Sequence, residues 1–292
     1  MHSLTLVACL GLALAPLAQA QFSPPPFLLG GEYQLDSDVD GGGSFSRAVA
    51  RARVSVPLFL GEDTIVGLGT SYQFESYQFD NLAPAPWDDI HRFRIGLVAK
   101  QELANGWSWL ALPFVSSDAE SGAEQSESFL FGGLGAAWYR ISDTLSLGVG
   151  AGFRTSLEDD TSIFPIIVID WQFAENWSLS TIPPRGFRFG PGVNLRWDAR
   201  DNLKLSLVYQ YQSDQQRLDE DSLSSPNGVG EFSQNRVSLA ATYHFTKNLS
   251  VTGHLGLTFG GEIELQDSSG DTLSESDFDT SLVFGLEGSL SF

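Results

Sequence analysis

Charged residues that recur at every second position are the feature of this sequence with the most chemical potential. Arg47, Arg51 and Arg53 share one parity in an alternating stretch, and Arg92 and Arg94 share one in another. A period of two is typical of a β-strand, where such residues lie on one face. Acidic residues fall on the same expected face of other stretches: Glu32, Glu75, Asp170, Glu262 and Glu287.

These ten side chains are candidates to line the interior of a closed sheet. A charged ladder across a lumen could set the selectivity of a pore. It could equally be a salt-bridged filling that closes the barrel, because buried arginines need carboxylate partners. The residue pattern leaves both interpretations open.

A second candidate is the stretch Asp36-Ser37-Asp38-Val39-Asp40-Gly41, which matches the opening of a calcium-binding loop. The position that should carry a bidentate Glu is Arg47, so the match fails at its decisive ligand. We therefore expect an acidic hairpin turn and no metal site, with Asp36, Asp38 and Asp40 as weak cation candidates. Diffuse binding of divalent cations by several acidic loops remains an alternative.

Hydrolysis is a third chemistry that residues of this sequence could support. His91 has outward parity, and Ser76 is outward and diagonal to it on the neighbouring strand. A serine nucleophile and its base need a third, orienting group, and none is evident from the sequence. The chain also has no G-x-x-x-x-G-K, G-x-S-x-G or H-E-x-x-H motif. We expect no cofactor and no enzyme, with lipid hydrolysis at His91 as the one enzymatic alternative.

The elements that must position these residues are strands with one apolar face and one polar or glycine-rich face, which is the pattern of a membrane barrel. The alternation is clearest at 29–35, 47–58, 66–75, 91–100, 145–154, 187–197, 203–212, 236–245 and 249–260. The last stretch, 281–292, ends on Phe292 and resembles the closing strand of bacterial outer-membrane barrels.

The connections between these stretches form two populations. Short turns begin near Gly61, Ala104, Ser142, Ala174, Ala199 and Thr246. Longer acidic loops occupy 36–43, 80–89, 118–127, 158–162, 219–233 and 267–276. Short periplasmic turns and long outer loops are typical of such barrels. With a seventh outer connection at 183–186 they predict an antiparallel barrel of about fourteen strands, or twelve if 177–192 is not two full strands.

Aromatic residues flank the short turns, where they would form one girdle at a membrane interface. They are Trp107, Trp109, Trp138, Tyr139, Trp171, Phe173, Trp177, Trp197, Tyr243 and Phe245.

One longer stretch carries a resemblance. FPIIVIDWQFAENWSLSTIPPRGFRFGPGVNLRWDARDNLKLSLVYQYQ has Pro and Asp-Trp before a turn, Trp-Ser-Leu after it and paired prolines beyond. This resembles a family of bacterial outer-membrane barrels catalogued as a domain of unknown function, over roughly Phe45 to Phe292. The resemblance implies the fold and the location, and it supplies no catalytic or binding residues.

The N-terminus and the composition indicate export, the bounds of the barrel and the kinds of partner that are excluded. Residues 1–20 have the apolar run and the Ala-Gln-Ala end of a signal peptide, although they contain no Lys or Arg. Residues 21–26 are a proline-rich lead-in, and 27–292 form the barrel. Cys9 lies in the signal, so the mature chain has no disulfide. The net charge of −20, from 36 acidic and 16 basic residues, argues against nucleic acid as a partner.

We therefore expect an outer-membrane pore or passive transporter for small polar solutes, with both termini in the periplasm. The acidic loops favour cations, and the inward arginines temper that preference. A closed barrel with a structural or surface-interaction role is the alternative. Expected partners are outer-membrane lipids, the barrel-assembly machinery and divalent cations at the acidic loops.

Overall fold

The computed structural model describes residues 26–158, 161–181 and 191–291. Fifteen strands and one turn of 3-10 helix make up these residues. They are β1 (Phe27–Asp38), β2 (Ser44–Leu60), β3 (Thr64–Asp80), β4 (Ile90–Glu102), β5 (Trp107–Glu120), η2 (Gln125–Glu127), β6 (Phe129–Ser142), β7 (Leu145–Arg154), β8 (Ser162–Ala174), β9 (Trp177–Ser180), β10 (Gly192–Arg200), β11 (Leu203–Arg217), β12 (Val229–His244), β13 (Leu249–Gln266), β14 (Thr272–Phe278) and β15 (Ser281–Leu290). No helix among the described residues is long and apolar enough to cross a membrane.

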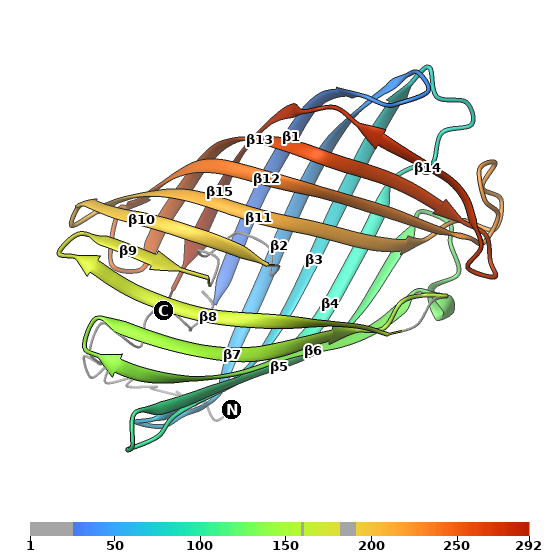
Figure 1. The fold of residues 1–292 in the computed structure, drawn as a ribbon. Coiled ribbons are helices and arrows are strands. Elements are labelled where there is room, and N and C mark those ends of the chain that lie inside the picture. The colour runs from blue at the N-terminus through green and yellow to red at the C-terminus, as the bar shows by residue number, and fades with distance from the viewer. Residues whose placement is uncertain (1–25, 159–160, 182–190, 292) are drawn as a thin grey trace, which may run out of the picture.

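The sheet closes on itself as a barrel (Figure 1). Strands β1 to β13 each pair antiparallel with the next strand in the sequence, and β1 completes the ring by pairing with β15. The long strand β13 pairs with β15 over Leu249–Thr258 and with β14 over Gly261–Gln266. Because β14 and β15 follow each other along β13, they act as one interrupted strand. The barrel therefore has fourteen strands, which confirms the predicted architecture.

The two ends of the barrel differ as the sequence predicts. Six short connections lie at one end, which we call the turn end: 61–63, 103–106, 143–144, 175–176, 201–202 and 245–248. At the opposite end, the loop end, the connections 39–43, 81–89, 121–128, 155–161, 218–228 and 267–271 join the strands. Several predicted loops are shorter than expected, and the differences are largest where β12 begins at Val229 and β14 at Thr272. The first residues of the predicted strand 187–197 lie outside the described residues.

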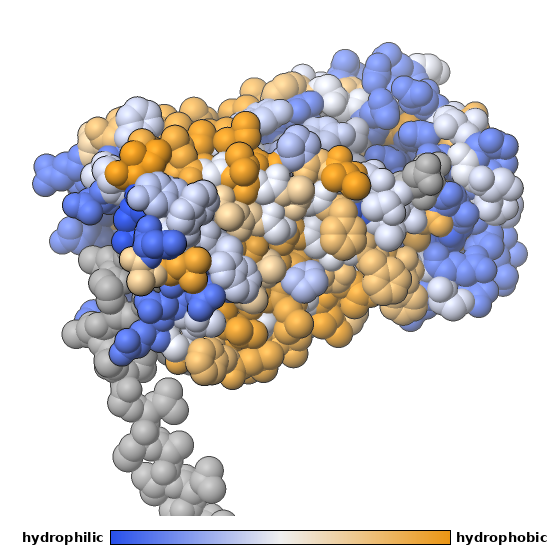
Figure 2. All heavy atoms as spheres, turned by 60° about the horizontal axis from the view of Figure 1, so that its bottom comes forward, coloured by the Kyte–Doolittle hydropathy of each residue, from blue (hydrophilic) through white to orange (hydrophobic). Residues whose placement is uncertain are grey.

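The outer wall is apolar. On the face that Figure 2 shows, hydrophobic side chains cover the middle of the barrel and hydrophilic side chains gather at its two ends. Ile163, Leu239 and Leu286 are among the large apolar residues exposed on this wall. The aromatic residues near the turns are exposed as expected for a girdle, with one exception. Trp138 is buried and packs inside the barrel with Leu110 and Val168, since its parity on β6 is inward.

Glycines on β7 make room for that tryptophan. A β-carbon on Gly148 would overlap the carbonyl oxygen of Ala137 and the side chain of Trp138. In the same way, a β-carbon on Gly152 would overlap the ring of Phe164. The inward glycines therefore receive large side chains from the neighbouring strands, and this wall is packed.

We predict that Gly148→Ala destabilises the barrel by about 1–3 kcal/mol, because an added methyl group has no space against backbone atoms. The free energy of unfolding of the refolded barrel in urea measures this loss. Gly135→Ala is the matched control, because a β-carbon there meets no heavy atom within 4 Å. Equal stability of the two variants would contradict this account of the β7 glycines.

Candidate functional site

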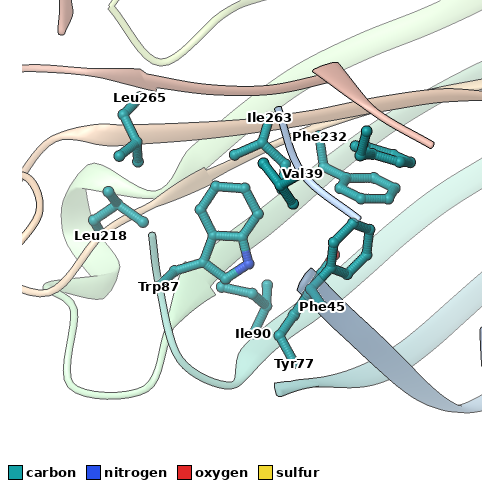
Figure 3. Packing of buried hydrophobic residues seen from close by; sticks show 10 residues of the cluster. Val39, Phe45, Tyr77, Trp87, Ile90, Leu218, Phe232, Ile263 and Leu265 are labelled. Carbon is teal, nitrogen blue, oxygen red and sulfur yellow. The ribbon is translucent and has the colours of Figure 1, made fainter. Parts of the chain in front are cut away.

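A cluster of ten buried apolar residues closes the loop end (Figure 3). We call it the loop-end core; its members are Val39, Phe45, Tyr77, Trp87, Ile90, Leu218, Phe232, Ile263, Leu265 and Phe278. Several aromatic rings meet edge to face, with 4.9 Å between the centroids of Phe45 and Phe278 and 5.6 Å between those of Tyr77 and Trp87. Because these residues come from six strands and three loops, the core joins opposite walls.

The barrel narrows at the same end because β11 reaches across to β5. Arg217, the last residue of β11, pairs in parallel with Ala119 of β5. The Arg217 guanidinium donates to the carbonyl oxygens of Glu127 and Asn227, at 3.2 and 2.9 Å, and forms an ion pair with Glu158. A single buried arginine therefore fastens three of the loops together.

Glu120 fastens two loops at the end of β5. Its carboxylate oxygens accept hydrogen bonds from the backbone N–H groups of Asp88, at 2.6 Å, and Asp219, at 2.8 Å. The carboxylate thus links the connection 81–89, which carries Trp87, to the connection 218–228, which carries Leu218.

A buried ion-pair network lies directly below the core. Glu75, with 0% of its side chain exposed, pairs with Arg47 at 2.6 Å and with Arg92 at 2.7 Å. Arg92 also reaches Asp118 at 3.3 Å and the β11 residue Gln216 at 2.6 Å. The Arg47 guanidinium lies 4.9 Å from the centroid of the Phe232 ring. These charged residues therefore support the closure of the barrel.

A second network lies farther toward the turn end. The Glu32 carboxylate is 2.7 Å from Arg236, 3.3 Å from Arg51 and 3.3 Å from His254. Arg53 lies within electrostatic range of Glu287 and Arg51. Arg94 shares this part of the interior, where its guanidinium stacks 4.4 Å from the centroid of the Phe114 ring.

Solvent access separates the two ends of the interior. At the turn end Arg196 pairs with Asp198 at 3.2 Å, and their side chains are 24% and 36% exposed. Asp170 is half-buried in the same region, within electrostatic range of Arg196 and Lys100. At the loop end Arg47 and Glu75 are 2% and 0% exposed. Among the described residues, charged pairs are therefore fully buried at the loop end, and at least one is partly exposed at the turn end.

The position of Glu262 differs from the prediction. Two residues of β13, Gly260 and Gly261, oppose the single residue Gln234 of β12, which is a β-bulge. Gly260 has a φ of +53°. The extra residue inverts the alternation beyond it, so that Ile263 enters the loop-end core and Glu262 faces outward. Glu262 lies there among other carboxylates of β12, β13 and β14 and does not line the interior.

An apolar wall inside the barrel was not predicted from the sequence. Buried Leu110, Ala136, Trp138 and Val168 pack with Val98, Leu112, Leu134 and Ile166 on the inward face of β4 to β8. The signal was present, since Leu110, Leu112, Leu134 and Trp138 share the parity of this face. The alternation did not reveal this wall, because a strand with apolar residues on both faces does not alternate between apolar and polar residues.

The calcium-like stretch shows no ligand cluster. Asp36, Asp38 and Asp40 are exposed around the end of β1. The described residues contain no group of three or more His, Cys, Asp or Glu side chains arranged to hold a metal ion.

Comparison with known proteins identifies a family. Residues 28–289 match the model of the family described as "Domain of unknown function (DUF6268)". The chain belongs to this family. No curated protein matches the sequence.

Several solved structures are similar to this chain. The toluene transporter TodX of P. putida gives a TM-score of 0.54 at 10% identity, over 94% of this chain and 92% of the other. A FadL homologue from Pseudomonas aeruginosa gives 0.49 at 12% identity, over 94% of each chain. An outer membrane channel from Pseudomonas putida F1 gives 0.49 at 9% identity, over 94% and 99%. The likeness to TodX supports the outer-membrane barrel fold.

We predict that Glu75→Gln destabilises the barrel by about 3–5 kcal/mol, because Arg47 and Arg92 would lose the charge that balances them in a buried site. Urea unfolding of the refolded variant measures the loss. Glu124→Gln makes the same chemical change on an exposed loop residue and should change the stability by less than about 1 kcal/mol. A small effect of both substitutions would show that the Glu75 network does not stabilise the loop end.

Proposed function

We propose that this protein is a passive outer-membrane transporter for small solutes, in a state closed at its loop end. The observation that carries the proposal is the contrast between the two ends of the interior. Arg196 and Asp198 are partly exposed at the turn end, whereas the loop-end core and the buried Glu75 network fill the other end. A barrel that is filled more tightly at one end suits a path with a gate at that end.

The orientation follows from the usual asymmetry of such barrels. Short turns face the periplasm and long loops face outward. On this basis the turn end and both termini are periplasmic after removal of residues 1–20, and the loop-end core closes the extracellular mouth.

The interior favours solutes with an anionic group and an apolar part. Four arginines face the region below the Glu75 network together with two glutamates: Arg51, Arg53, Arg94, Arg236, Glu32 and Glu287. The apolar wall of β4 to β8 lies on the same side as Arg94 and Phe114. An excess of positive charge in a low-dielectric lumen attracts anions. This proposal replaces the expected preference for cations, which rested on the acidic loops, with a preference for amphipathic anions. An apolar wall accords with the fold shared with a toluene transporter.

We predict that Glu120→Ala opens the path. The substitution removes the acceptor of two backbone N–H groups and so releases the loops 81–89 and 218–228. One hydrogen bond to a charged group is worth roughly 1.5–3 kcal/mol, so the open fraction should rise by at least about tenfold. Single-channel recording of the refolded mature chain in planar bilayers measures the open fraction.

Glu124→Ala is the control for that experiment, because it removes the same charge from an exposed neighbour that bonds only within its own loop. It should leave the open fraction unchanged. If the wild type and Glu120→Ala are both folded, as judged by heat-modifiable migration, and neither conducts, the transport proposal fails. The alternative of a closed barrel with a structural role would then stand.

The preference for anions gives a separate prediction. Arg53→Gln and Arg94→Gln, introduced together into the Glu120→Ala background, should shift the reversal potential in a salt gradient toward cation preference. The reason is that two of four cationic groups are lost while Glu32 and Glu287 remain. An unchanged reversal potential would show that permeating ions do not pass these arginines.

A further inference from the structure

A hydrogen-bonded Ser–His–Tyr array lies on the outer surface near the loop end. The Nε2 atom of His91 is 3.0 Å from the Oγ atom of Ser121. The Nδ1 atom of the same ring is 2.7 Å from the Oη atom of Tyr72. This is the spatial order of a nucleophile, a base and an orienting group. The expected partner Ser76 takes no part in it.

Three separate elements position the array. His91 is the second residue of β4 and has outward parity, since Arg92 beside it is buried in the interior network. Tyr72 lies on the neighbouring strand β3, and its ring stacks on the His91 ring with 6.1 Å between centroids. Phe74, also on β3, contacts the other part of the imidazole, with 5.3 Å between centroids. The aromatic contacts therefore fix the plane of the ring.

Ser121 occupies a tight turn that presents its hydroxyl group to His91. The backbone N–H of Ala123 donates to the carbonyl oxygen of Glu120, and Gly122 has a φ of +99°. The turn is held in place because the Ser121 N–H donates to the Asp89 carbonyl oxygen at 2.8 Å.

The array lies at the level where a membrane presents its ester groups. Exposed aromatic side chains surround the array on the outer wall near the loop end. They are Tyr72 on β3, Phe93 on β4, and Phe129 and Phe131 on β6. Aromatic belts mark the boundary between the hydrocarbon and the polar headgroups. Ser121 and the acidic loops lie on the polar side of this belt. A lipid beside the barrel would place its acyl ester near this serine.

We propose that Ser121 and His91 form a catalytic site that hydrolyses acyl esters of glycerophospholipids at the outer surface of the barrel. Ser121 Oγ attacks the ester carbonyl carbon while His91 Nε2 takes the hydroxyl proton. The bond between the carbonyl carbon and the alcohol oxygen breaks, and His91 returns the proton to the leaving alcohol. Water then attacks the acyl-serine with His91 as the base, which releases the fatty acid and restores the Ser121 hydroxyl group.

Tyr72 acts as a positioning residue in this scheme. With the Nδ1–H of His91 donating to the Tyr72 Oη atom, the Nε2 lone pair is left to accept the proton of Ser121. A neutral phenol balances the imidazolium less well than a carboxylate does. Hydrolysis should therefore be slow compared with that of enzymes that have an acidic third member.

The test measures release of fatty acid from phosphatidylethanolamine in mixed micelles by the full mature chain, refolded from inclusion bodies so that no host lipase is present. Wild type should hydrolyse the lipid, and Ser121→Ala and His91→Asn should each lose on the order of a thousandfold in rate. Tyr72→Phe keeps the stacked ring, so it should lower kcat on the order of tenfold and leave KM unchanged. Ser76→Ala is the matched control and should retain the wild-type rate.

A second readout does not depend on turnover. A fluorophosphonate probe should label Ser121 in the wild type and fail to label the His91→Asn variant, as read by peptide mass spectrometry. Heat-modifiable migration confirms that each variant is folded. Absence of both lipid hydrolysis and Ser121 labelling in the folded wild type would overturn the proposal, as would hydrolysis that survives Ser121→Ala. Neither result bears on conductance, which is measured separately.

Discussion

The structure depends on one constraint, which is that every backbone polar group of a membrane-spanning segment needs a partner within the protein. The pairing of β1 with β15 meets this constraint, because it removes the two free edges of the sheet. Closure divides the side chains into an outward and an inward set. The outward set can be apolar throughout, but the inward set must fill or line a space of fixed width, and its charged groups must find partners there.

The inward charged groups and the space between them are accommodated differently at the two ends of the interior. At the loop end, Glu75 satisfies two arginines and apolar residues seal the remaining space, so the barrel is closed by the same contacts that stabilise it. Toward the turn end some charged groups are partly solvated, as Arg196 and Asp198 are. If the proposed function holds, opening requires that loop contacts such as those of Glu120 break and that the loop residues Trp87 and Leu218 leave the core. The strands can stay paired during this change.

The alternation of the sequence predicted the strands, the strand number and the inward arginines, because the period of two is set by the backbone itself. It placed Glu262 wrongly because the bulge at Gly260 and Gly261 adds one residue to β13 and so exchanges the inward and outward faces beyond it. A pair of glycines alone is not enough to predict a bulge from the sequence. Ser121 was missed as the partner of His91 for a different reason. It lies in a loop, and the approach of a loop to a strand depends on tertiary contacts such as the Ser121 N–H bond to Asp89.

The same alternation lets one strand serve two sites. His91 faces outward, where Tyr72 and Ser121 contact it, and Arg92 faces inward, where Glu75 and Asp118 contact it. The two side chains are adjacent in sequence but lie on opposite faces of the wall. The electrostatics of the interior can therefore change without altering the hydrogen bonds of the outer array. The backbones of β3 and β4, which carry residues of both sites, and the loop after β5 connect them, because Glu120 fastens the closed end and Ser121 follows it directly. If opening of the loop end moves that loop, it also moves Ser121 relative to His91, so the closed state is the one in which the array is assembled.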